Sequence, residues 1–116
     1  MAIEGIGDPA VYFKNLGELH DARVTAFYWS KPNRLFNISV DDINSNFLGL
    51  PEYQGLQPAD VVFSGITSLD CDVQVSDDSF SIFAVEIEQE ANGYKVDIRC
   101  SPGGHFKFYC EEIGVS

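Results

Sequence analysis

The segment "FAVEIEQEANGYKVDIRC", residues 83–100, constrains the fold more than any other part of the sequence. Its Asn92-Gly93 dipeptide is the strongest short signal for a two-residue hairpin turn, in which both residues adopt positive φ. A turn centred there sets Glu86 opposite Arg99, with charged side chains on one face and apolar side chains on the other. The paired positions are then Ala91 with Tyr94, Glu90 with Lys95, Glu86 with Arg99, Ile87 with Ile98 and Val85 with Cys100.

A second hairpin follows directly, because Ser101-Pro102-Gly103-Gly104-His105 has the composition of a turn. A three-residue loop at 102–104 continues the apolar face of the first hairpin onto the next strand. The predicted pairs are Ser101 with His105, Cys100 with Phe106, Ile98 with Phe108 and Val96 with Cys110. The opposite face is charged, so we expect one face of this sheet to be core and the other to be solvated.

The strand pattern extends upstream of these hairpins. The stretches "ARVTAFYWS" and "RLFNISVDD" predict a hairpin around Lys31-Pro32-Asn33. "ADVVFSGITSL", residues 59–69, is the next predicted strand. "CDVQV" then follows a bend at residues 68–70 and leads into a turn at residues 76–79.

A short helix is predicted before the first strand, since Asp8 suits the N-cap, Pro9 the first helical position and Gly17 a left-handed stop. The remaining pattern contains about seven antiparallel strands. We therefore expect one mainly β domain over residues 1–116, with the strands in an antiparallel meander behind a short N-terminal helix. The pattern does not distinguish a barrel-like sheet from a sandwich.

The chain is strongly acidic, with 18 acidic residues against seven basic ones and a net charge of −11. Such a surface repels phosphate backbones and anionic lipid headgroups, so neither nucleic acid nor a membrane is an expected partner. The opening "MAIEGIGDPA" lacks the basic start and apolar core of a signal peptide, and we expect a cytoplasmic protein. The charge either serves solubility or steers the protein toward a basic partner.

No motif in the sequence predicts catalysis, a cofactor or a metal, and we expect no enzyme activity. Cys71, Cys100 and Cys110 lack disulfide-framework and zinc spacing, so they are expected to be buried, reduced thiols. His20-Asp21 stands where the helix gives way to the first strand. A metal or catalytic dyad would need companion residues that the sequence does not place nearby, so bonds that close this junction are the favoured interpretation.

Residues 43–58, "INSNFLGLPEYQGLQP", follow no secondary-structure period. Loops of this length are uncommon in compact domains and are often functional. Their apolar side chains either cap the open end of the sheet or form a contact surface. For the second case, the predicted partner-binding residues are Phe47, Leu50 and Tyr53, with an acidic rim of Asp41, Asp42 and Glu52.

Four segments together resemble a group of small bacterial β-rich proteins that open with a Leu-His-Asp-x-x-Val motif. The segments are "LHDARV" from residue 19, "RLFNISVD", "ADVVFSGITSL" and "FKFYCEEI". Some members of this group are classed with the immunity proteins of polymorphic toxin systems, and many have no known function. The resemblance implies a protein that neutralises a toxin, and it makes His20 and Asp21 hallmarks without giving them a role.

The predicted function is therefore that of a small, acidic, cytoplasmic protein-binding domain of immunity type, whose partner is another protein such as a basic toxin. The alternative is an accessory or self-associating β-domain, and homo-oligomers are compatible with the sequence. An enzyme or a metal-dependent protein is the least favoured interpretation.

Overall fold

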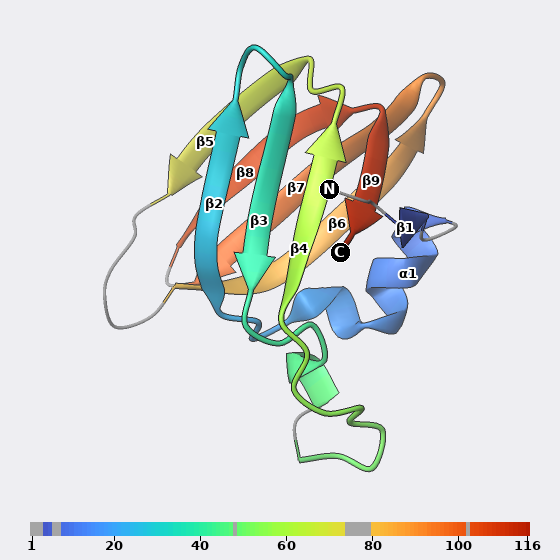
Figure 1. The fold of residues 1–116 in the computed structure, drawn as a ribbon, viewed down its shortest axis with the longest axis vertical. Helices are drawn as coiled ribbons and strands as arrows, with labels where there is room; N and C mark the ends of the chain where they lie inside the picture. The colour runs from blue at the N-terminus through green and yellow to red at the C-terminus, as the bar shows by residue number, and fades with distance from the viewer. Residues whose placement is uncertain (1–3, 6–7, 48, 74–79, 102) are drawn as a thin grey trace.

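Two antiparallel sheets pack face to face in the computed structural model (Figure 1), which describes residues 4–5, 8–47, 49–73, 80–101 and 103–116. The first sheet has the order β1-β9-β4-β3-β2 and the second has the order β5-β8-β7-β6. The strands are β1 Glu4–Gly5, β2 Val24–Ser30, β3 Leu35–Val40, β4 Ala59–Ser64, β5 Ser68–Val73, β6 Ser81–Glu90, β7 Gly93–Ser101, β8 Gly104–Cys110 and β9 Glu112–Val115. The mainly β prediction is confirmed, and the two separate sheets form a sandwich.

The seven predicted strands correspond to β2 through β8. Within each sheet, strands that follow one another in the chain are neighbours, as β2-β3-β4 and β6-β7-β8. The chain passes from the first sheet to the second after β4 and returns after β8, where β9 pairs with β4. These two crossings join the layers of the sandwich at one end (Figure 1).

The bend that the sequence predicts at residues 68–70 lies earlier, between Ser64 and Ser68, where the chain crosses to the second sheet. The strand expected over 59–69 ends at Ser64, and the predicted bend at 68–70 is instead the start of β5. Gly65 turns the chain with a φ of +71°. The Arg34 side chain holds the turn, because its Nε donates to the carbonyl of Ile66 at 3.0 Å. The predicted turn at residues 76–79 lies outside the described residues.

The β6-β7 hairpin forms, but its register differs from the prediction by two residues. Glu90 pairs with Gly93, so the turn consists of Ala91 and Asn92, and Glu86 lies opposite Asp97. Asn92 does not adopt positive φ. The reason lies in Gly93, where a Cβ atom would stand 2.1 Å from the carbonyl oxygen of Cys110. The neighbouring strand thus requires glycine within β7, and the turn moves back along the chain.

The β7-β8 hairpin is shifted in the same way. Phe106 pairs with Ile98, whereas the sequence predicts that Phe106 pairs with Cys100. Gly104 belongs to β8 and not to the loop, because a Cβ there would lie 2.5 Å from the carbonyl oxygen of Asp72 on β5. Both shifts are even, and therefore every side chain keeps its predicted face.

The predicted faces of this sheet are confirmed. Cys100 and Phe106 are both buried in the core. On the outer face Arg99 reaches Glu86 across the diagonal, with 3.8 Å between Nη2 and Oε1. The outer face is mostly exposed, with Asp97 half-buried; its residues are Glu86, Glu88, Asp97, Arg99, Lys107, Tyr109 and Glu111.

Helix α1 spans Pro9–Asn15 and begins as predicted, with the Asp8 side chain accepting from the Ala10 N–H at 3.0 Å. A 3₁₀ turn, η1 (Gly17–Leu19), follows, and Gly17 has a φ of +68°. Both elements pack against β6 and bury Phe13 and Leu19. Within the described residues, neither α1 nor the short 3₁₀ turns have the length and apolar character needed to cross a bilayer.

Aromatic side chains from both sheets fill the space between the layers. Phe63 meets Phe108 edge-on with ring centroids 4.8 Å apart, and Phe36 lies 5.0 Å from Phe106. Edge-to-face and tilted ring pairs of this kind are favourable beyond the area they bury. This core fixes the two sheets as a platform for the loops at the ends of the sandwich.

Candidate functional site

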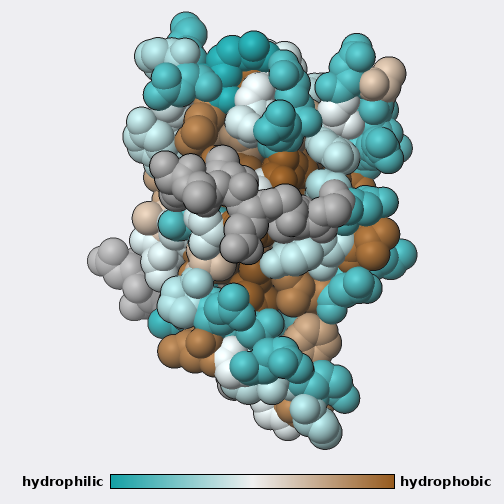
Figure 2. All heavy atoms as spheres, turned by 45° about the vertical axis from the view of Figure 1, so that its right-hand side comes forward, coloured by the Kyte–Doolittle hydropathy of each residue, from teal (hydrophilic) through white to brown (hydrophobic). Residues whose placement is uncertain are grey.

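The segment 42–57, hereafter the 42–57 loop, projects beyond the end of the sandwich between β3 and β4 (Figure 1). It contains the 3₁₀ turn η2, Ser45–Phe47. Figure 2 shows it as a protrusion at the lower end of the molecule, with hydrophilic and hydrophobic side chains side by side. Its base is buried: Asp42 is 5% exposed, Asn44 4% and Ile43 3%.

Asp42 organises this loop with three hydrogen bonds. Its Oδ1 accepts from the Asn44 N–H at 3.0 Å and from the Gln57 N–H at 3.2 Å, and its Oδ2 accepts from the Tyr53 hydroxyl at 2.6 Å. A buried carboxylate needs such donors to offset its lost hydration. The prediction that Asp42 belongs to an exposed acidic rim is therefore wrong, since its carboxylate faces the inside of the loop.

Further bonds close the base of the loop. The Ile43 N–H donates to the Gln57 carbonyl at 2.9 Å, and the Asn44 side-chain amide donates to the Gly55 carbonyl at 3.0 Å. The hydrogen bond to Asp42 also raises the pKa of Tyr53, with burial and the charge of the two carboxylates, Asp42 and Asp41, adding to the shift. The loop is thus an ordered structure with its own polar interior.

Two leucines of the loop are open to solvent, Leu50 in its outer part and Leu56 beside its base, between Gly55 and Gln57. Leu50 is 51% exposed and Leu56 is 73% exposed. Of the other predicted interface residues, Phe47 and Tyr53 are half-buried and Glu52 is exposed. Ile43 therefore caps the core of the domain, as the first alternative predicts. Leu50 and Leu56 do not, because both are exposed. Leu56 was not placed in the predicted interface, although its position between Gly55 and Pro58 marks it as a loop residue.

Asp41 is the second predicted rim residue with an internal bond. It is half-buried, and its carboxylate accepts from the Arg23 N–H at 3.1 Å. This bond ties the end of β3 to the start of β2. Glu52 is consequently the predicted rim residue that is fully available at the surface.

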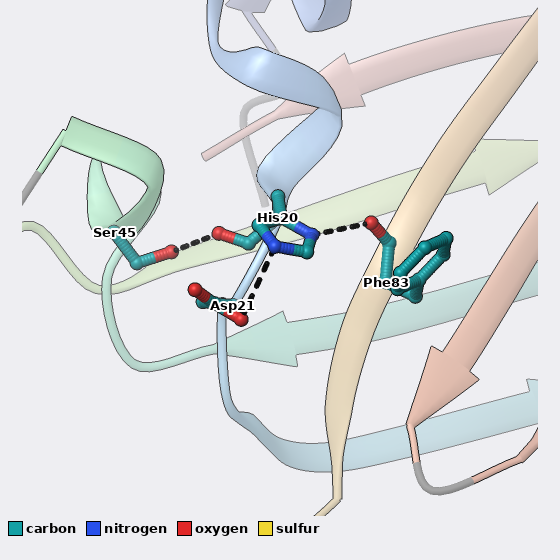
Figure 3. A network of polar contacts seen from close by, with 4 residues as sticks. All are labelled: His20, Asp21, Ser45 and Phe83. Carbon is teal, nitrogen blue, oxygen red and sulfur yellow. Dashed lines mark hydrogen bonds and ion pairs between the residues drawn. The ribbon is translucent and has the colours of Figure 1, made fainter.

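His20 and Asp21 lie at the junction of η1 and β2, where they hold three elements together (Figure 3). His20 Nδ1 donates to the Phe83 carbonyl on β6 at 2.8 Å, and its ring meets the Phe83 ring edge-on at 5.4 Å. The His20 carbonyl accepts from the Ser45 hydroxyl at 3.1 Å. The predicted structural role of His20 agrees with these contacts.

A structural role at this junction predicts that the Asp21 carboxylate accepts from a nearby backbone N–H, and this bond does not form among the residues that the structure describes. Its carboxylate stands 3.5 Å from His20 Nε2 and is 73% exposed, and no backbone N–H within the described residues donates to it. Its own N–H donates to the Ile82 carbonyl at 2.9 Å, and its φ is +69°. In the described part of the chain, no three His, Cys, Asp or Glu side chains gather closely enough to hold a metal ion.

The three cysteines are free thiols. Burial raises the pKa of Cys100 to about 11 and that of Cys110 to about 12, so both stay protonated and unreactive at neutral pH. Cys71 is exposed on β5, against the expectation of burial. Because β5 is the last strand of its sheet, no further strand covers this position.

Strand β2 carries partly exposed aromatic side chains on both of its faces, and sequence reasoning missed their exposure. Phe27, Tyr28 and Trp29 are 40%, 57% and 38% exposed. Their run of aromatic residues is typical of a buried strand. In the structure, the burial of side chains along β2 does not alternate, because five consecutive residues from Thr25 are exposed.

No family model matches the chain, and no curated protein matches it. Among solved structures, the fold is similar to the crystal structure of an uncharacterized protein from Neisseria gonorrhoeae, with a TM-score of 0.56 and 13% sequence identity. The similarity covers 84% of this chain and 91% of that chain. A likeness at this identity shows the fold alone.

Proposed function

We propose that this protein is a small acidic protein-binding domain of immunity type, which neutralises a basic protein by covering it with the 42–57 loop. The observation that carries the proposal is the combination of a buried polar interior with exposed apolar side chains. Asp42 fixes the loop from within, while Leu50 and Leu56 stay exposed. The proposed activity is binding, without a chemical step.

The order of the loop favours tight binding. A flexible loop loses conformational entropy when a partner fixes it, whereas a loop already held by internal bonds loses less. Apolar side chains at the centre of an interface supply much of its binding energy, and surrounding polar residues exclude water. Leu50 and Leu56 are proposed as the central anchors, with Glu52 beside them as the exposed charge.

The net charge supports a basic partner. A charge of −11 attracts a positively charged protein over several ångströms and raises the rate of association, an effect that salt screens. We also place the protein in the cytoplasm, because reduced thiols such as its three free cysteines persist there.

The test compares two substitutions of equal exposure. Leu50→Asp changes an exposed residue of the loop, and Val11→Asp changes an α1 residue that is 52% exposed and lies outside the loop. The neighbouring genes are first searched for a basic protein; its binding to both variants is then measured by calorimetry, and association rates are followed at increasing salt. We expect Leu50→Asp to weaken binding about 100-fold, as for an anchor residue, and Val11→Asp to leave it unchanged.

Equal affinities of the two variants would contradict the role of the loop. An association rate that does not fall with salt would contradict steering by charge. Far-UV circular dichroism of both variants establishes that the fold is intact, so that a loss of binding reports on the contact and not on unfolding.

A further inference from the structure

The two sheets end in four edge strands, and three of them carry a known protection against pairing with another chain. Strand β1 has two residues, β5 carries Asp70 and Asp72, and β6 is covered by α1 and η1. Strand β2 has seven residues, "VTAFYWS", without a charge or a proline. Within the described residues β2 is therefore the unprotected edge.

The outer side of β2 offers backbone groups for a further strand. Val24 at its start donates to the Phe80 carbonyl at 2.9 Å. From residue 25 to residue 30, the described part of the chain supplies no backbone partner on the side away from β3. An extended peptide added to such an edge gains a row of main-chain hydrogen bonds.

A hollow of about 420 Å³ lies at the end of this edge, between the two sheets. Trp29 points toward it, because Trp29 pairs with Phe36 and shares its inward face. Ile66 and Leu69 line the opposite side, and Lys31 and Arg34 stand at its rim. An inward-pointing apolar side chain of an added strand would fit this space, and a neighbouring carboxylate would meet the cations.

The segment that contains β2 is rich in basic residues, although Asp21 and Asp41 flank it and the Asp41 carboxylate accepts from the Arg23 N–H. Residues 22–40 contain three of the seven basic residues of the chain and none of its 18 acidic residues. Arg23 precedes β2 and Lys31 follows it, and both are exposed. Arg34 is already engaged, since it pairs with Glu111 at 3.5 Å. Arg23 and Lys31 therefore mark the two ends of a locally basic strip.

We propose that β2 binds an extended segment of another protein as an added antiparallel strand, with an apolar side chain in the hollow beside Trp29 and acidic side chains at Arg23 and Lys31. This surface is separate from the 42–57 loop and has the opposite charge preference. It gives the protein a second interface, for an acidic and apolar peptide.

A second copy of this chain fits the edge less well. Two β2 strands paired antiparallel about Phe27 would set Arg23 of each copy against Lys31 of the other. Like charges directly opposite one another destabilise a strand pair. The two copies would also repel each other, because each has a net charge of −11. The acidic peptide removes the first repulsion and satisfies both cations.

The experiment uses two synthetic nine-residue peptides with blocked ends. Both alternate valine and threonine and carry one phenylalanine near an end; one has aspartate at both termini and the other has lysine. Binding to the full chain is measured by fluorescence anisotropy, and the contact is located by amide hydrogen exchange. We expect the aspartate peptide to bind about tenfold more tightly and to slow exchange at residues 25–30.

Charge reversal supplies the matched control. Arg23→Glu with Lys31→Glu should reverse the preference between the peptides, whereas Lys14→Glu with Lys95→Glu changes the net charge equally and should preserve it. Leu50→Asp should leave peptide binding unchanged, which separates this proposal from the function of the loop. Equal affinities, absence of binding, or protection elsewhere would overturn the proposal. Sedimentation that shows a dimer broken by Phe27→Lys would assign the edge to a second copy instead.

Discussion

The 42–57 loop and the β2 edge both expose apolar side chains, but they are ordered by different means. The loop is held by side-chain bonds to Asp42, and its two exposed leucines, Leu50 and Leu56, lie outside this polar interior. The β2 edge is held by backbone pairing with β3, and its aromatic residues lie along a strand. The loop should therefore depend on one buried carboxylate, and β2 should tolerate replacement of an outward-facing side chain such as Tyr28.

Because the two surfaces are built differently, they suit different kinds of partner. The loop presents a few side chains from a fixed backbone, which suits a folded protein with a complementary surface. The edge presents backbone groups beside a hollow, which suits an extended chain. A single small domain can thus carry two interfaces whose energetic origins do not overlap.

The largest expected effect is the loss of the Asp42 carboxylate. Asp42→Ala leaves the N–H groups of Asn44 and Gln57 and the Tyr53 hydroxyl without their acceptor. Unsatisfied polar groups of this kind cost about 1–3 kcal/mol each, so we expect the free energy of unfolding to fall by about 3 kcal/mol. Urea denaturation measures it. A loss below about 1 kcal/mol would mean that the loop does not depend on Asp42.

A smaller effect is expected for Tyr53→Phe, which removes one of the three bonds and keeps the ring. The Tm should fall by less than for Asp42→Ala. The hydrogen bond raises the pKa of Tyr53 in the folded state, so its contribution is complete below the ordinary pKa of about 10 and is lost as pH rises through the folded value. Thermal melts at pH 7 and at increasing alkaline pH should show the two proteins converging. A constant difference would contradict the bond.

Much of the fold is predictable because its signals are local. The Asp8 cap, the β2-β3 hairpin and the alternation of the last three strands follow from short stretches of sequence. The registers are not local. Gly93 and Gly104 read as turn residues, yet each lies in a strand because a carbonyl of the neighbouring strand leaves no room for a Cβ. That contact joins residues far apart in the chain, and turn chemistry alone does not reveal it.

In the candidate site, too, the features with local signals were predicted and those that depend on distant contacts were not. Residues 43–58 show neither the helical nor the strand pattern of apolar residues, and this identifies the loop. The exposure of Leu50 agrees with its prediction as a surface residue of the loop. Whether a carboxylate faces inward or outward depends on donors from distant positions, and the sequence therefore misplaced Asp42. Strand β2 was predicted as a strand, but its edge position was missed, because its composition does not give its place in the sheet order. Edge position depends on topology, which single-strand patterns do not specify.

The smallest expected effect concerns β2 and is the sharpest test of the comparison. Tyr28 pairs with Asn37 on the outer face and is 57% exposed, and threonine has a comparable preference for strands. Tyr28→Thr should therefore change the free energy of unfolding by less than about 0.5 kcal/mol, as for most surface substitutions. Urea denaturation gives the energy, and hydrogen exchange at residues 25–30 gives the state of the edge. A loss above about 1 kcal/mol would mean that the Tyr28 ring packs beneath another part of the chain. Protection of the amides of residues 25–30 in the free protein would mean that the edge itself is covered, and β2 would no longer be open to an added strand.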